Sequence, residues 1–329
     1  EEVVYLYEGR DIRHQWTPLK RISPHLIRAV IASEDNEFCH HWGIDFNEYG
    51  HAFIEACVIP HLFHMIQGGR YQRQGGQHYA PTIEEARRIA PDYFAQDFAK
   101  PGKQPINPFI YDDLKTIADH RHYLGGSPHG GNARSDSAGG GHAHAGLMCY
   151  LGGSWPKEYH GQLIIGNIHG QRLNVDVPER KGSGYVGKHA PDFLNFNDRW
   201  SQTLDQRYDQ DGNVFIIDWY DKQQCHTGNA AAHDRSNGRI YKIVYGDKKG
   251  TQVDLAKMSS EQLVEQQLHS NEWQARHARR ILQERGKNLE AYQAALKRMD
   301  MLRPDEEGKM LRLLWTAHLT APMPAHSSV

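Results

Sequence analysis

The chain has 329 residues, a length that allows two or three domains of ordinary size. Its 38 basic and 40 acidic residues give a formal net charge of -2, so no basic excess indicates nucleic-acid binding. No stretch approaches the roughly 18 apolar residues of a membrane-spanning helix, and the 4 cysteines form neither a CxxC pair nor a CxxCH haem motif. The chain begins with glutamate, so we expect a processed chain or a fragment.

Residues 1–45 predict a short extended piece followed by a helix. Ser23 is a suitable helix cap, and Pro24 suits the first helical position, where its missing N–H leaves no bond unmade. The apolar residues that follow recur at helical spacing: Leu26, Ile27, Val30 and Ile31. A polar run from 33 to 36 follows them.

Residues 46–253 predict short strands joined by turns and loops. Apolar runs at 162–167, 213–218 and 239–245 have the length of strands, and the last two follow Asp-Gly and Asn-Gly turns. Such spacing is typical of sandwiches and propellers. Residues 80–106 interrupt the pattern and are expected to be an insertion.

Residues 254–329 predict helices. Ser259 can cap the first of them, and Trp273, His277 and Ile281 share one face of the second. Apolar residues at 289–299 and 310–319 supply two more. Short helices in antiparallel order favour a helical-repeat element that docks on the β region.

Several motifs in residues 46–320 resemble one family, the PVC-type (planctomycete and verrucomicrobial) membrane-bound dehydrogenase or haem-binding proteins. The motifs are GGGHAHAG at 139–146, YLGGSWP at 150–156, NIHGQRLN at 167–174, and the runs at 59–71, 182–187, 218–221 and 233–241. The resemblance implies a mainly β fold: a partial β-propeller like that of quinoprotein sugar dehydrogenases at 46–253, then an α-helical HEAT-like region at 254–329. The family's haem domain is missing from this chain.

The same resemblance implies an extracytoplasmic or periplasmic protein that oxidises a sugar or alcohol, or binds carbohydrate. Pyrroloquinoline quinone and Ca²⁺ would be the cofactors, a sugar or glycan the partner, and a separate haem domain the electron acceptor. His142 and His144 alternate along an extended segment, so both imidazoles can face one ligand, and either could be the catalytic base. The alternative is that they form hydrogen bonds across a loop.

Other polar residues are candidates for holding the cofactors. The quinone candidates are His169, Arg172, Arg235 and Arg239, because arginine pairs well with carboxylates. Asp218 and Asp221 are candidate Ca²⁺ ligands through their hard oxygens. The alternative is structural: the arginines pair with neighbouring aspartates, and the two acids lie on the surface.

The first 45 residues resemble an unrelated family, the monofunctional biosynthetic peptidoglycan transglycosylases. The motif E-D-x-x-F-x-x-H-x-G begins at Glu34 and ends at Gly43. The resemblance implies that Glu34 acts on the attacking hydroxyl of a lipid-linked sugar. The family's later segments, with its second essential glutamate, do not follow. We therefore expect a chimeric sequence, a junction of two unrelated genes or an artificial composite.

Three functions thus compete. A dehydrogenase predicts quinone binding and sugar-dependent dye reduction. A non-catalytic scaffold or binding module predicts glycan binding without redox activity. A peptidoglycan glycosyltransferase predicts polymerisation of the lipid-linked disaccharide, with loss of activity when Glu34 is changed. Most of the chain lies outside the third resemblance, which disfavours that function, and the sequence does not separate the first two.

Overall fold

The structure is a computed structural model. It describes residues 3–6, 10–13, 44–56, 61–67, 69, 71, 114, 116–118, 120, 122, 143–223, 229–234, 236–246 and 250–322. The helix predicted after Ser23 and the insertion predicted at 80–106 lie outside this described part.

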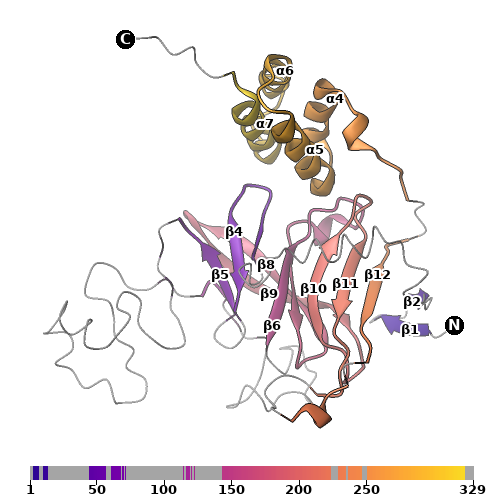
Figure 1. Cartoon of the computed structure of the whole chain (residues 1–329). Helices are drawn as coiled ribbons and strands as arrows, with labels where there is room; N and C mark the ends of the chain where they lie inside the picture. The colour runs from indigo at the N-terminus through magenta and orange to yellow at the C-terminus, as the bar shows by residue number, and fades with distance from the viewer. Residues whose placement is uncertain are drawn as a thin grey trace, which may run out of the picture.

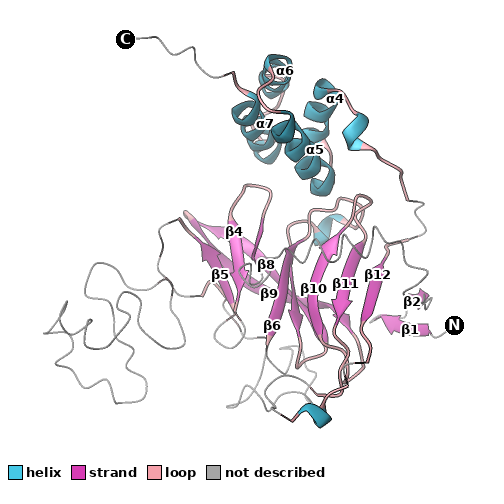
Figure 2. Ribbon diagram, in the orientation of Figure 1, coloured by secondary structure: helices cyan, strands magenta, loops and turns pink. Residues whose placement is uncertain are grey.

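The strands form antiparallel sheets in which sequence neighbours pair (Figures 1 and 2). Strand β1 (Val3–Leu6) pairs antiparallel with β2 (Arg10–Arg13). One three-stranded sheet contains β3 (Ile44–Phe46), β4 (Ala52–Glu55) and β5 (Leu62–Met65). The four-stranded sheet contains β6 (His144–Cys149), β7 (Leu163–Asn167), β8 (Arg172–Lys181) and β9 (Gly184–Asn195). A second three-stranded sheet contains β10 (Thr203–Tyr208), β11 (Val214–Asp218) and β12 (Arg239–Ile243).

The four-stranded sheet is buried on both faces. Along β7, Ile164 packs into one apolar cluster with β11 and β12, while Leu163 and Ile165 pack into another with Phe53 of β4. Side chains of a strand alternate between faces, so the three consecutive apolar residues at 163–165 of β7 are what a strand covered on both sides requires. The cores of the β region therefore lie on both sides of this sheet.

The helices form a small bundle after the last strand. They are α4 (Ser260–Glu265), α5 (Glu272–Arg285), α6 (Leu289–Met299) and α7 (Glu307–Thr320). Ser259 caps α4 in a reciprocal capping box with Gln262, as its sequence predicts. Short 3₁₀ turns (Lys157–Tyr159, Ala230–Ala232, Leu255–Lys257 and Gln266–Leu268) complete the described helical structure.

Helix α5 fastens the bundle to one end of the strands (Figure 1). The backbone N–H of Glu272 donates to the Leu151 carbonyl at 2.9 Å. The Arg276 guanidinium lies 3.2 Å from the Asp45 carboxylate and donates to the Phe46 carbonyl at 2.9 Å. Because these contacts reach both the four-stranded sheet and the β3–β5 sheet, the bundle holds the two sheets together.

The prediction of a partial β-propeller is wrong. The described strands form separate sheets of two, three, three and four strands that close into neither a barrel nor a propeller. Strand β6 instead packs against β10 of one neighbouring sheet and against β3 and β4 of the other. The strands predicted near 162–167, 213–218 and 239–245 are present as β7, β11 and β12. Turn signals identify hairpins, but they do not say how hairpins associate.

The prediction of HEAT-like repeats is also wrong. Helix α4 packs on α5 and α6, and α7 packs on the same two helices, so the four enclose one apolar core. The described helices number only four, fewer than the roughly three stacked pairs that a repeat array needs, and no HEAT-like repeat is evident among them. The predicted helices themselves are present, and α6 begins and ends where its apolar pattern does. The domain boundaries drawn from the sequence stay predictions.

Candidate metal centre

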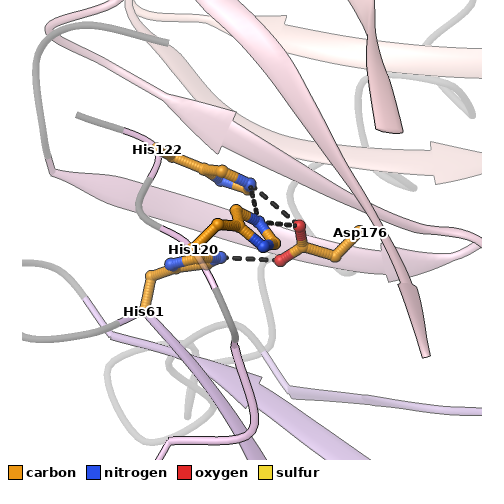
Figure 3. Close-up of side chains that lie close together, drawn as sticks. All are labelled: His61, His120, His122 and Asp176. Atoms are coloured by element: carbon orange, nitrogen blue, oxygen red, sulfur yellow. Dashed lines mark hydrogen bonds and ion pairs between the residues drawn. The ribbon is translucent and has the colours of Figure 1, made fainter. Parts of the chain in front are cut away.

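Three imidazoles converge on one buried carboxylate between the sheets (Figure 3). His61 Nε2 lies 2.6 Å from Asp176 Oδ2. His120 Nε2 and His122 Nε2 lie 2.6 Å and 2.9 Å from Asp176 Oδ1, and 3.0 Å from each other. One ligand atom from each of the four residues falls within 4.8 Å of the others. The arrangement has the atom types and the compactness of a metal-binding site.

The fold brings these residues together from three distant parts of the chain. Asp176 lies on β8, and His61 directly precedes β5. Residues 116–118 run between β5 and β9: the N–H of Ile117 donates to the Leu62 carbonyl, and the N–H of Gly187 donates to the Ile117 carbonyl. This short crossing segment sets the place of His120 and His122 beside β8.

Burial is nearly complete. The side chains of His122 and Asp176 are fully buried, and that of His120 is 18% exposed, so His120 is the side of the cluster nearest to solvent. Burial and the neighbouring His61 lower the pKa of His122 to about 3, which keeps its imidazole neutral at pH 7. Burial alone would raise the pKa of Asp176, but hydrogen bonds from the three imidazoles hold it well below its ordinary value. Neutral imidazoles and an ionised carboxylate are the forms that bind metal ions.

Two further histidines line the same cluster. The ring of His144 lies 5.1 Å from that of His61 and 5.4 Å from that of His122. The ring of His189 lies 5.1 Å and 5.2 Å from those of His120 and His122. His144 begins β6 and is only 4% exposed, and His189 lies on β9. Five imidazoles therefore surround one carboxylate.

The hydrogen bonds of the cluster leave buried nitrogens unused. In the described part of the chain, Nδ1 of His61, His122 and His189 has no hydrogen-bond partner, and His144 has only the backbone of Ala56. A buried polar atom without a partner costs about 1–3 kcal/mol of folding free energy. A cation bound by an unused nitrogen of His144 or His189 would offset part of this cost.

The sequence predicted one member of this cluster. His144, proposed as a catalytic base, is part of it, whereas its predicted companion His142 lies outside the described residues, as do Glu34 and Arg235. The sequence analysis does not single out the other members, which are His61, His120, His122, His189 and Asp176. The His-x-His spacing at 120–122 and the 22 histidines of the chain were the available signals.

The remaining predicted residues are placed apart from the cluster. Arg172 donates to the Gly170 carbonyl and pairs with Asp192 at 2.5 Å. His169, in the turn between β7 and β8, is buried, and its carbonyl accepts a hydrogen bond from Gln171. The quinone-binding role of these residues stays a prediction.

The predicted Ca²⁺ ligands each have protein partners. Asp218 accepts hydrogen bonds from Ser201 and the backbone of Gln202, and pairs with Arg239 at 2.7 Å. Asp221 pairs with His233 at 3.0 Å. The arginine–aspartate pair of the structural alternative is thus present at Arg239, but both acids are buried and do not lie on the surface. Ca²⁺ binding there stays a prediction.

Comparison with known families places most of the chain. The model of a family described as a domain of unknown function, DUF7133, matches residues 12–247. The chain belongs to this family. The match takes in β3 through β12 and every histidine of the cluster. This family gives no support to a propeller dehydrogenase. The prediction that the chain is an oxidoreductase is therefore withdrawn.

Short stretches also match curated proteins named biosynthetic peptidoglycan transglycosylase. The Caulobacter vibrioides protein is 45% identical over 51 residues, 16% of this chain and 22% of that protein. The Rhodospirillum centenum protein is 58% identical over 36 residues, which are 11% of this chain and 16% of that protein. The Chromobacterium violaceum protein is 49% identical over 111 residues, which are 34% of this chain and 42% of that protein.

These similarities are partial. The chain spans less than half the length of each of these curated relatives. No solved structure matches the chain. Among the residues that the structure describes, no helix is both long enough and apolar enough to cross a membrane.

Proposed function

We propose that this DUF7133 domain binds a divalent transition-metal ion through His61, His120, His122 and Asp176. The observation that carries the proposal is the convergence of three Nε2 atoms on one buried carboxylate, all within 4.8 Å. Imidazole nitrogens favour zinc, copper, nickel and cobalt over Mg²⁺ and Ca²⁺, which prefer all-oxygen sites. A bound ion would attract the ionised Asp176 and take the lone pairs of the neutral imidazoles.

The ion would also connect the fold. Its ligands are His61 just before β5, His120 and His122 just after the crossing segment, and Asp176 on β8. Binding therefore links two sheets that the backbone ladders do not join. A ligand that binds only the folded state raises the free energy of unfolding by mass action. We therefore expect the metal to raise the unfolding midpoint of the full chain.

The test is metal analysis of the full chain after chelation, followed by dialysis against Zn²⁺. Wild type is expected to retain zinc and to melt at a higher temperature than the chelated protein. Asp176→Asn is expected to weaken zinc binding by at least about tenfold. His318→Ala, at an exposed position on α7, is the matched control and should behave as wild type. A wild-type protein that retains no zinc, copper or cobalt would refute the proposal.

A second candidate, peptidoglycan glycosyl transfer, has a separate basis. Matches of 45% and 58% identity to transglycosylases support it over short stretches of the chain. The candidate reaction is polymerisation of a lipid-linked disaccharide, with Glu34 acting on the attacking hydroxyl. This function would place the protein outside the cytoplasm. Polymer formation by the full chain that is lost in Glu34→Gln and kept in Glu37→Gln would support this function. Equal inactivity of all three proteins would exclude it.

Neither proposal accounts for the other predicted cofactors and partners. Pyrroloquinoline quinone, Ca²⁺, a sugar or glycan ligand and a haem-domain acceptor stay predictions. The scaffold hypothesis is compatible with a metal ion that only stabilises the fold. If zinc binds to the chain and leaves glycan binding unchanged, the result would favour an ion that only stabilises the fold.

A further inference from the structure

We infer that the cluster holds two divalent ions bridged by Asp176, an inference that rests on the proposed metal-binding function. A single ion would use the four residues already described. The cluster contains more ligands than one ion needs, and the carboxylate divides them into two groups.

The first observation is how Asp176 shares its oxygens. Oδ2 faces His61 at 2.6 Å, whereas Oδ1 faces His120 at 2.6 Å and His122 at 2.9 Å (Figure 3). A carboxylate that bridges two ions gives one oxygen to each of them. The two ions of such centres lie about 3.5–4 Å apart.

The second observation is the two extra imidazoles. The ring of His144 lies 5.1 Å from that of His61, on the Oδ2 side, and 5.4 Å from that of His122. The ring of His189 lies 5.1 Å from that of His120, on the Oδ1 side. Within the described residues, Nδ1 of His189 has no hydrogen-bond partner and His144 has only the backbone of Ala56, so each ring has a nitrogen available to an ion.

The ligands therefore divide into two sets. The first ion takes His61, His144 and Asp176 Oδ2. The second takes His120, His122, His189 and Asp176 Oδ1. Three protein ligands leave the first ion an open position, the arrangement that catalytic sites use for water or substrate. Two divalent ions and one carboxylate leave an excess of positive charge, so the ligand class expected between the ions is a small oxygen anion such as hydroxide or phosphate.

Copper is the probe for the test, because two neighbouring Cu²⁺ ions couple magnetically and lose much of their electron paramagnetic resonance signal. The full chain is loaded with Cu²⁺, and bound copper and signal intensity are both measured. Wild type is expected to bind two ions per chain with far less signal than two isolated ions give. His144→Ala is expected to bind one ion fewer and to regain the full signal of one isolated ion.

The possible outcomes separate the two proposals. Wild type with no bound copper or zinc refutes the metal centre itself. One tightly bound ion, unchanged in His144→Ala, leaves the metal centre standing and overturns the second ion. Two ions with full signal intensity also overturn the bridged pair, because the second ion then lies elsewhere. If His144→Ala does not fold, the wild-type signal and the milder His189→Gln variant, with one ion weakened, decide the question.

Discussion

Glu55 makes the stability of the protein depend on pH in a way that the structure specifies. It is the last residue of β4 and is 7% exposed, and its Oε2 has no hydrogen-bond partner among the described residues. Burial raises the pKa of Glu55 from 4.5 to about 8, and the negative charge of Asp205 acts in the same direction. The carboxyl group is therefore largely protonated in the folded protein at pH 7.

The sign of the pH effect on stability depends on whether the folded or the unfolded state binds the proton of Glu55 more tightly. Because the folded-state pKa is raised, the folded protein keeps a proton that the unfolded chain has lost. The stabilisation is fully present below pH 4.5 and is lost as the pH rises through about 8. The difference between these pKa values corresponds to about 5 kcal/mol of unfolding free energy. Deprotonation of Glu55 thus removes a large part of an ordinary domain's stability.

The assay is urea unfolding of wild type and Glu55→Gln at pH 5, 7 and 9, with a chelator present so that metal binding does not contribute. The glutamine variant carries no ionisable group at this position. Its stability relative to wild type is expected to rise by about 3–5 kcal/mol between pH 5 and pH 9. Glu284→Gln, on the exposed face of α5, is the matched control and should follow wild type. Parallel pH profiles for wild type and Glu55→Gln would refute the reasoning.

Three other substitutions test the packing. Arg276→Ala leaves the largely buried Asp45 without its cation. We expect it to lower the free energy of unfolding in urea by about 3 kcal/mol. A loss below about 1 kcal/mol would mean that the pair does not hold α5 to the sheets. Gly153→Ala combines a φ of +69° with a carbonyl oxygen 2.7 Å from the new methyl, so it should destabilise more than Gly246→Ala, which has a similar φ and open space. Equal losses at the two glycines would contradict this. Ser259→Ala removes the cap of α4 and should lower the melting midpoint by the equivalent of about 1 kcal/mol, with an unchanged midpoint as the contrary result.

Local structure was predictable from the sequence wherever it depends on neighbouring residues. The capping box at Ser259 and the extent of α6 follow from backbone preferences and helical spacing. The strand at β7 follows from its three consecutive apolar residues at 163–165, which fit burial on both faces. The association of these elements was predicted wrongly, as blades of a propeller and as stacked repeats, because a hairpin's sequence does not encode which sheet covers its faces.

The candidate metal centre shows the same division. The sequence determined that the chain is rich in histidine, and it singled out His144 as a functional candidate. Only the tertiary structure decided that His61, His120 and Asp176, which are far apart along the chain, place their ligand atoms within 4.8 Å of one another. The physical reason is that metal coordination depends on distances of a few ångströms across segments, and these distances are set by how the β5, β8 and β9 strands and the crossing segment pack together.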